Sequence, residues 1–179
     1  MKSSIYIVLF SFITFNSYCQ TNQADKSKKD EGISSEPFLI KTEQITLQTA
    51  IQLTTLARKK ASALGKDVSV AVLDAGGQTI VLSRGDRVGI HNTEAARRKA
   101  FTAASTKTAT LILARNARSN PDTENLAHLP ELLLLGGGIP LYHDGKVIGA
   151  IGIAGGGGPE NDDLIGRSAS IPKADIIAR

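Results

Sequence analysis

Four polar residues suited to binding a small acid fall within one short stretch of the sequence. Arg84 and Asp86 stand in a predicted loop, and His91 lies just before a predicted helix that contains Lys99. Arginine binds a carboxylate through two parallel hydrogen bonds, and the N-terminus of a helix favours anionic groups. The stretch therefore predicts a binding site for an acidic ligand. The plainer alternatives are a surface ion pair, a histidine that only hydrogen-bonds its own loop, and a solvated lysine.

Glycines stand at both outer ends of a predicted β-hairpin further along the chain. Asp144-Gly145 separates two alternating apolar runs, a pattern typical of a tight hairpin turn. Glycines at the ends of such a hairpin let the backbone approach either a ligand or another part of the protein. The glycines proposed to line a site are Gly137, Gly138, Gly155 and Gly156. We expect a pocket between these two loops and the His91 end of the helix.

Residue types and spacings argue against several kinds of catalytic site. The only cysteine is Cys19, no serine stands in a sequence context with a histidine, and the three histidines are not spaced as zinc ligands. The glycine-rich loops lack the Walker and Rossmann patterns. These observations leave enzymatic activity undecided and favour a binding protein.

The N-terminus is predicted to be a signal peptide over residues 1–19. Lys2 precedes an apolar run, residues 5–15, that is too short to span a bilayer, and small residues precede Gln20. Cleavage there predicts an exported protein, periplasmic or secreted, with no membrane span. The alternative is a lipid anchor on Cys19, which bulky Tyr18 disfavours.

Polar residues dominate the segment that follows the predicted signal peptide. Residues 20–41 form a predicted flexible linker, and residues 42–179 a single domain. The formal net charge is +4 with the charges interspersed, and the one short basic run has no neighbouring aromatic residues. We therefore expect no nucleic-acid partner.

Hydrophobic periodicity places two hairpins among several helices. Thr46 is predicted to cap a helix with one buried stripe that includes Leu47 and Ile51, and Asn92 or Thr93 to cap the helix that contains Lys99. Residues 126–135 are ambiguous between strand and helix. The predicted helices are residues 46–64, 94–105, 108–117 and a last one from about Asp162, and the predicted strands are residues 68–73, 79–83 and the two arms of the hairpin described above. Hairpins between helices predict an α+β domain with an antiparallel sheet.

Five short stretches occur in an order that resembles a known family. They are LDAGG at residues 73–77, RGD at 84–86, RKAFTA at 98–103, GGIP at 137–140 and GAIG at 149–152. Together they resemble the GlcG/HbpS family of haem-binding or haem-degrading domains, to which the PduO C-terminal domain also belongs. The resemblance implies a profilin-like fold, a five-stranded antiparallel sheet with flanking helices. It also implies haem or a related tetrapyrrole as ligand, and a homo-oligomer.

Haem would need an axial ligand from this chain, and few residues qualify. His91 is the first choice, and Tyr142 is a further candidate for the pocket wall. His143 beside the hairpin turn and His128 in the ambiguous segment are less favoured. The resemblance also allows a weakly ligating threonine, and Thr93, Thr102 and Thr106 are available.

Two functional hypotheses follow from these residues and from the resemblance. The first is an exported binding domain for haem capture, buffering or sensing. The second is an enzyme or accessory protein acting on a small organic acid or cofactor, with Arg84, Asp86, His91 and Lys99 lining the site.

Overall fold

The computed structural model describes residues 38–179, of which Lys41–Arg179 form one compact unit. The predicted signal peptide and nearly all of the predicted linker lie outside the described residues. The helices are α1 (Leu47–Ala63), α2 (His91–Thr106), α3 (Thr110–Ser119) and α4 (Pro159–Arg167), with short 3-10 helices η2 (Glu124–His128) and η3 (Pro172–Ala174). The strands are β1 (Ser69–Asp74), β2 (Thr79–Ser83), β3 (Gly138–His143), β4 (Lys146–Ala154) and β5 (Ile177–Ala178).

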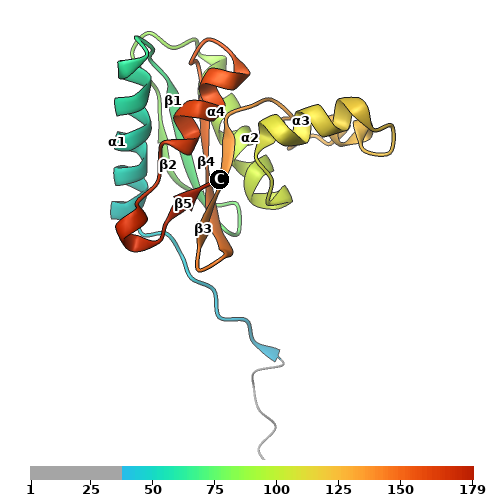
Figure 1. The fold of residues 1–179 in the computed structure, drawn as a ribbon, viewed down its shortest axis with the longest axis horizontal. Helices are drawn as coiled ribbons and strands as arrows, with labels where there is room; N and C mark the ends of the chain where they lie inside the picture. The colour runs from blue at the N-terminus through green and yellow to red at the C-terminus, as the bar shows by residue number, and fades with distance from the viewer. Residues whose placement is uncertain (1–37) are drawn as a thin grey trace, which may run out of the picture. The chain divides into compact units, whose positions relative to one another are not determined.

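The five strands form one antiparallel sheet in the order β2-β1-β4-β3-β5 (Figure 1). Both predicted hairpins are present, and their inner strands β1 and β4 pair along the centre of the sheet. Asp144 and Gly145 take positive φ values of 46° and 72°, as a tight hairpin turn requires. The predicted α+β architecture, a five-stranded antiparallel sheet with flanking helices, is confirmed.

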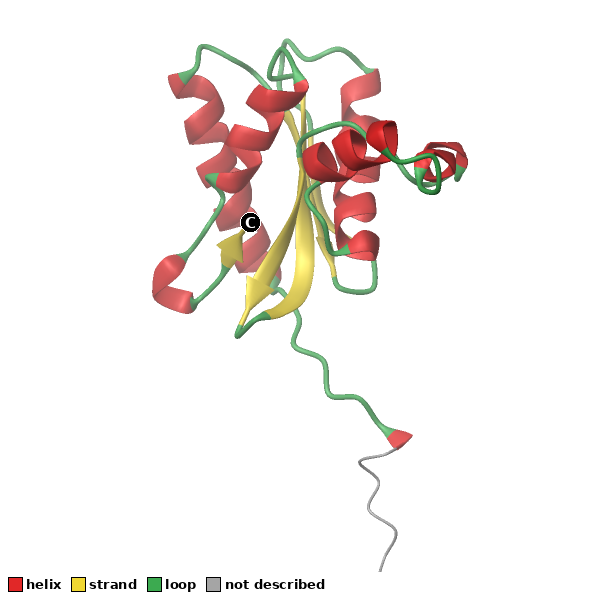
Figure 2. Ribbon diagram, turned by 45° about the vertical axis from the view of Figure 1, so that its right-hand side comes forward, coloured by secondary structure: helices red, strands yellow, loops and turns green. Residues whose placement is uncertain are grey.

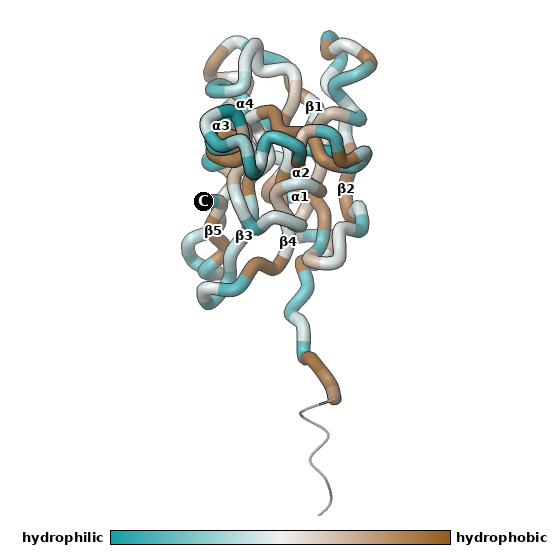
Figure 3. The backbone as a smooth tube through the Cα atoms, turned by 90° about the vertical axis from the view of Figure 1, so that its right-hand side faces the viewer, coloured by the Kyte–Doolittle hydropathy of each residue, from teal (hydrophilic) through white to brown (hydrophobic). Residues whose placement is uncertain are grey.

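Helices cover both faces of the sheet (Figure 2). Helix α2 packs on β4, β1 and β3, whereas α1 and α4 pack on the opposite face. Small side chains bring α2 very close to the strands: the position of a Cβ on Gly152 of β4 is occupied by the Ala96 carbonyl and by Ala100. The alanines of α2 therefore serve close packing on the sheet. Hydrophobic segments lie mainly in the strands, and hydrophilic ones in loops and on the outer turns of the helices (Figure 3).

Helix α1 begins as the sequence predicts, but its buried face is narrower. The Thr46 side chain accepts a hydrogen bond from the Thr49 N–H, which confirms the predicted cap. Ala50, Leu53 and Ala57 are fully buried, whereas Leu47 and Ile51 are 59% and 52% exposed. Including these two in the buried stripe was wrong, because the sheet covers only one side of the helix.

Helix α2 begins earlier than predicted, at His91. Ile90 precedes it without any side-chain cap, so neither Asn92 nor Thr93 caps the helix. The Thr93 hydroxyl instead lies 3.3 Å from the Ser69 hydroxyl of β1. The prediction of the cap was wrong because this threonine has a partner that is distant in sequence.

Helix α3 and the segment after it project sideways from the sheet (Figure 1). The ambiguous residues 126–135 contain the end of η2 and then an irregular strand-free segment. Side chains of α2 hold that segment in place: Arg98 donates to the Pro130 and Leu132 carbonyls, and Thr102 accepts from the Leu133 N–H. Within the described residues, no helix is long and apolar enough to cross a membrane.

Candidate functional site

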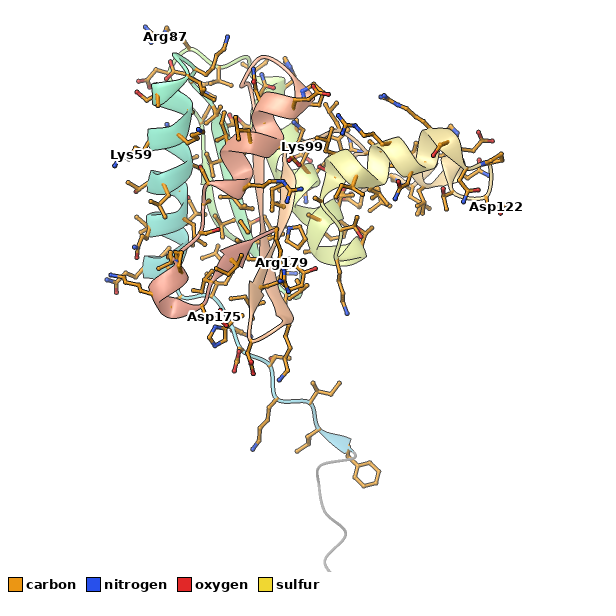
Figure 4. The ribbon with its side chains drawn as sticks, viewed as in Figure 1. Lys59, Arg87, Lys99, Asp122, Asp175 and Arg179 are labelled. Atoms are coloured by element: carbon orange, nitrogen blue, oxygen red, sulfur yellow. The ribbon has the colours of Figure 1, made fainter. Side chains whose placement is uncertain are left out.

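A buried ion pair lies at the centre of the region where the sequence predicts a pocket. Lys99 of α2 is 1% exposed, and its Nζ donates to Asp162 Oδ2 at 2.7 Å and to the Ile153 carbonyl at 2.9 Å. Asp162 of α4 also accepts from the Gly156 N–H through Oδ1, at 2.7 Å. Figure 4 shows Lys99 in the interior, between α2 and α4. The pair thus connects α2, the end of β4, the loop after it, and α4.

Burial sets the direction of the pKa shift of Lys99. Loss of hydration lowers the pKa of this lysine below 10.5, and the charge and hydrogen bond of Asp162 offset part of that effect. An ammonium group that is buried and bonded in this way is held in one orientation. Lys99 is therefore neither solvated nor available to an acidic ligand at the surface.

The glycine loops pack against this ion pair. A Cβ on Gly137 would contact Asp162 Cβ and lie 3.3 Å from Lys99 Nζ, and one on Gly138 would overlap the Lys99 carbonyl. A Cβ on Gly156 would lie 2.6 Å from Asp162 Oδ1. The two loops therefore enclose an ion pair of the protein itself, where the sequence predicts a ligand pocket. These contacts show the close approach to another part of the protein that the sequence analysis gives as one of two explanations.

The four polar residues predicted to line one site do not come together. Arg84, Asp86 and His91 are exposed, whereas Lys99 is buried. His91 and Lys99 are eight residues apart on α2, about 12 Å along the helix axis at the standard rise. His91 folds back on its own loop, with Cε1 3.1 Å from the position of a Cβ on Gly89. An acid-binding site that uses all four residues is incompatible with this arrangement.

Tyr142 and His143 lie near the hairpin turn, beside the last residues of the chain. The Tyr142 hydroxyl donates to the Lys107 carbonyl at 3.1 Å, and the Arg179 guanidinium lies 4.5 Å from the centre of the Tyr142 ring. His143 has Glu43 Oε2 3.7 Å from Nε2 and Asp175 Oδ2 3.9 Å from Nδ1. Among residues 38–179 no cluster of three or more histidine or acidic side chains could hold a bare metal ion.

The structure contains an open groove that sequence reasoning missed. It lies between α3 and η2 and has a volume of about 430 Å³. Its lining residues are Ala114, Ala117, Arg118, Glu124, Ala127 and Leu134. Two smaller hollows have volumes of about 190 Å³, beside Phe101 and the β1–β2 turn, and about 70 Å³, beside Tyr142. Of these three hollows in the described part of the chain, the groove alone falls in the 300–1,000 Å³ range typical of small-molecule sites.

Sequence reasoning also missed the structural role of Asp162. Its position at the start of α4 predicts a capping role, but no side chain caps α4, and the carboxylate instead accepts from the Gly156 N–H in the loop before the helix. The partnership with Lys99 joins positions that are 63 residues apart. No local sequence pattern predicts such a pair. A lysine among the alanines of a helix that faces a sheet nevertheless indicates that the lysine is buried.

Comparison with known proteins fits both the fold and the position of the glycine loops. The family described as "Haem degrading protein HbpS-like" matches residues 45–170. The chain belongs to the HbpS-like family. The match spans strands β1 to β4, the covering helices and the Lys99–Asp162 pair, and so contains both glycine loops.

Two solved structures show the same fold at substantial sequence identity. A double mutant of HbpS from Streptomyces reticuli is 35% identical, with a TM-score of 0.68, over 74% of this chain and 88% of that one. PduOC in complex with haem is 33% identical, with a TM-score of 0.67, over 75% of this chain and 97% of that one. The chain also resembles the corrinoid adenosyltransferase PduO of Salmonella typhimurium, at 35% identity over 115 residues. That match covers 63% of this chain but only 34% of PduO.

Proposed function

We propose that this HbpS-like chain binds haem. The observation that carries the proposal is its likeness to PduOC, a protein solved with haem bound, across 97% of that chain at 33% identity. Bound haem would supply an iron centre and two carboxylates, and the chain would supply the cavity, a cation and an iron ligand. The role we propose is haem capture, buffering or sensing.

The described residues contain the donor types that haem needs. The only cysteine and the only methionine of the chain are Cys19 and Met1, so between residues 38 and 179 a strong axial ligand would have to be a histidine or Tyr142. Thr102 is a poor alternative because it is buried and its hydroxyl already bonds the Arg98 carbonyl and the Leu133 N–H. The Tyr142 hydroxyl already donates to the Lys107 carbonyl, so a histidine nitrogen is the ligand that we expect.

Titration of haemin into the full chain tests the proposal. We expect a saturable shift of the Soret band at micromolar protein, with one haem per chain. The same chain unfolded in urea is the control for nonspecific adsorption. The proposal fails if the folded chain and the unfolded chain give the same spectrum. Incubation of the complex with ascorbate then separates stable binding from haem degradation, because only degradation bleaches the band.

Export and self-association are further proposals. The charged and apolar pattern of residues 1–19 supports export to the periplasm or the medium, which N-terminal sequencing of protein recovered outside the cytoplasm would test. Large apolar side chains that are 40–50% exposed on and near α3 and α4 support a homo-oligomer, which light scattering would test. These side chains are Ile112, Leu129, Leu135 and Leu164.

A further inference from the structure

The groove between α3 and η2 is a hollow that its own chain leaves unfilled. Its volume is about 430 Å³, and its floor consists mainly of alanine side chains. Ala114 and Ala117 of α3 are buried at this floor, and Ala127 lines the groove from η2. Protein interiors and the centres of interfaces are close-packed. A hollow of this size on an arm that projects from the sheet (Figure 1) is therefore suited to side chains from a partner.

Two side chains of opposite charge line the two walls of this groove. Arg118 belongs to α3 and Glu124 to η2, and both residues are exposed. Within residues 38–179 neither takes part in an ion pair, whereas Arg115 of the same helix pairs with Glu160 at 3.1 Å. A partner that fits this surface therefore presents an acidic group to the α3 wall and a basic group to the η2 wall.

A second copy of this chain presents both groups in the required arrangement. In a contact about a twofold axis the same patch meets itself, and each residue of one copy faces its counterpart reciprocally. A patch with charges of one sign repels its own copy, whereas a patch with one charge of each sign, on opposite walls, can pair with itself. When α3 of each copy lies against η2 of the other, both copies contribute one arginine and one glutamate to the contact.

We propose that two copies of this chain pair through the α3–η2 groove about a twofold axis, with Arg118 of each copy binding Glu124 of the partner subunit. This inference rests on the proposed self-association, since it assigns that association to one surface. The alanine floor suits the incoming arginine, because an arginine packs its methylene stem along apolar surface while its guanidinium binds a carboxylate through two hydrogen bonds. The proposal thus uses both the hollow and the two unpaired charges that line it.

Size-exclusion chromatography with light scattering, on the full chain and its charge variants, tests this interface. Arg118→Glu and Glu124→Arg each place like charges at both reciprocal contacts, so each should weaken the association by about tenfold or more and lower the mass of the assembly. An equimolar mixture of the two variants should associate again, because each variant supplies the charge that the other lacks. Circular dichroism confirms that each variant is folded.

Arg115→Glu is the matched control, since it reverses an exposed arginine of the same helix that does not line the groove. We expect this variant to keep the mass of the wild type. If the wild type associates but both groove variants keep its mass, or if their mixture stays dissociated, the contact lies elsewhere. This inference is then overturned while self-association stands. If the wild type is a single chain at every concentration, the proposed self-association itself fails, and the haemin titration still decides the proposal of haem binding.

Discussion

Removing the Lys99 ammonium should lower the free energy of unfolding of this protein more than any substitution at its surface. In Lys99→Met the side chain keeps a similar length and apolar volume, so little packing is lost. Asp162 keeps its bond from the Gly156 N–H but loses the partner of Oδ2, and the Ile153 carbonyl loses a donor. A buried carboxylate stripped of its cation typically costs 3–5 kcal/mol, so we expect a loss of about 4 kcal/mol in the free energy of unfolding.

A double variant separates the cost of the orphaned charge from the value of the pair. Lys99→Met with Asp162→Asn removes both charges while the amide oxygen can still accept from Gly156. Replacing both partners of a buried pair is often nearly neutral, so the double variant should recover about 3 kcal/mol relative to Lys99→Met alone. The two substitutions are therefore expected to be strongly non-additive.

Urea unfolding followed by far-UV circular dichroism measures these differences. The control is Arg115→Met, which breaks a pair whose side chains are 61% and 67% exposed and which also reaches α4. We expect it to change stability by less than about 1 kcal/mol. A cost below about 1 kcal/mol for Lys99→Met, or additive effects in the double variant, would refute the reasoning that burial makes this pair structurally decisive.

Three further predictions concern packing, the irregular segment and pH. Gly138→Ala should cost more than about 2 kcal/mol in urea unfolding, because its Cβ would overlap the Lys99 carbonyl, whereas Gly145→Ala, at φ +72° in open space, should cost only about 1 kcal/mol. Thr102→Val should cost about 1–2 kcal/mol and speed hydrogen exchange at the Leu133 amide, which loses its acceptor; unchanged exchange there would contradict it. Burial lowers the pKa of Lys99 in the folded protein below 10.5, its ordinary value in the unfolded chain. Between the folded-state pKa and 10.5 the unfolded chain therefore binds more protons than the folded one. In that pH interval the stability of wild type should rise with pH relative to the Lys99→Met, Asp162→Asn variant. A flat difference between the two proteins across that interval would show that the lysine is not shifted.

Much of the fold is predictable because the signals that encode it are local. Thr46 marks the start of α1, and the Asp144-Gly145 turn pairs His143 with Lys146 at the end of the β3–β4 hairpin. Residues 79–83 were predicted as a strand with the same bounds as β2. Each of these features depends on residues within a few positions of one another, where backbone preference and side-chain periodicity act directly.

The predictions were wrong where a residue distant in sequence determines the contacts of a side chain. Leu47 and Ile51 have the right spacing for burial but face away from the sheet, and Thr93 bonds Ser69 instead of capping its helix. The groove escaped prediction because its walls come from α3, η2 and Leu134, which no single periodic pattern connects. Its volume depends on how α3 is placed, and the sequence of α3 alone does not contain that information.

The sequence by itself determined the class of fold, the two hairpins and the family resemblance, since these rest on patterns read along the chain. Only the tertiary structure decided what the polar residues do. Lys99 and Asp162 are distant in sequence, and their meeting in the interior turned a predicted ligand-binding lysine into a structural one. The physical reason is desolvation, because a charge that is excluded from water must find its counter-charge inside the protein, wherever the fold brings one.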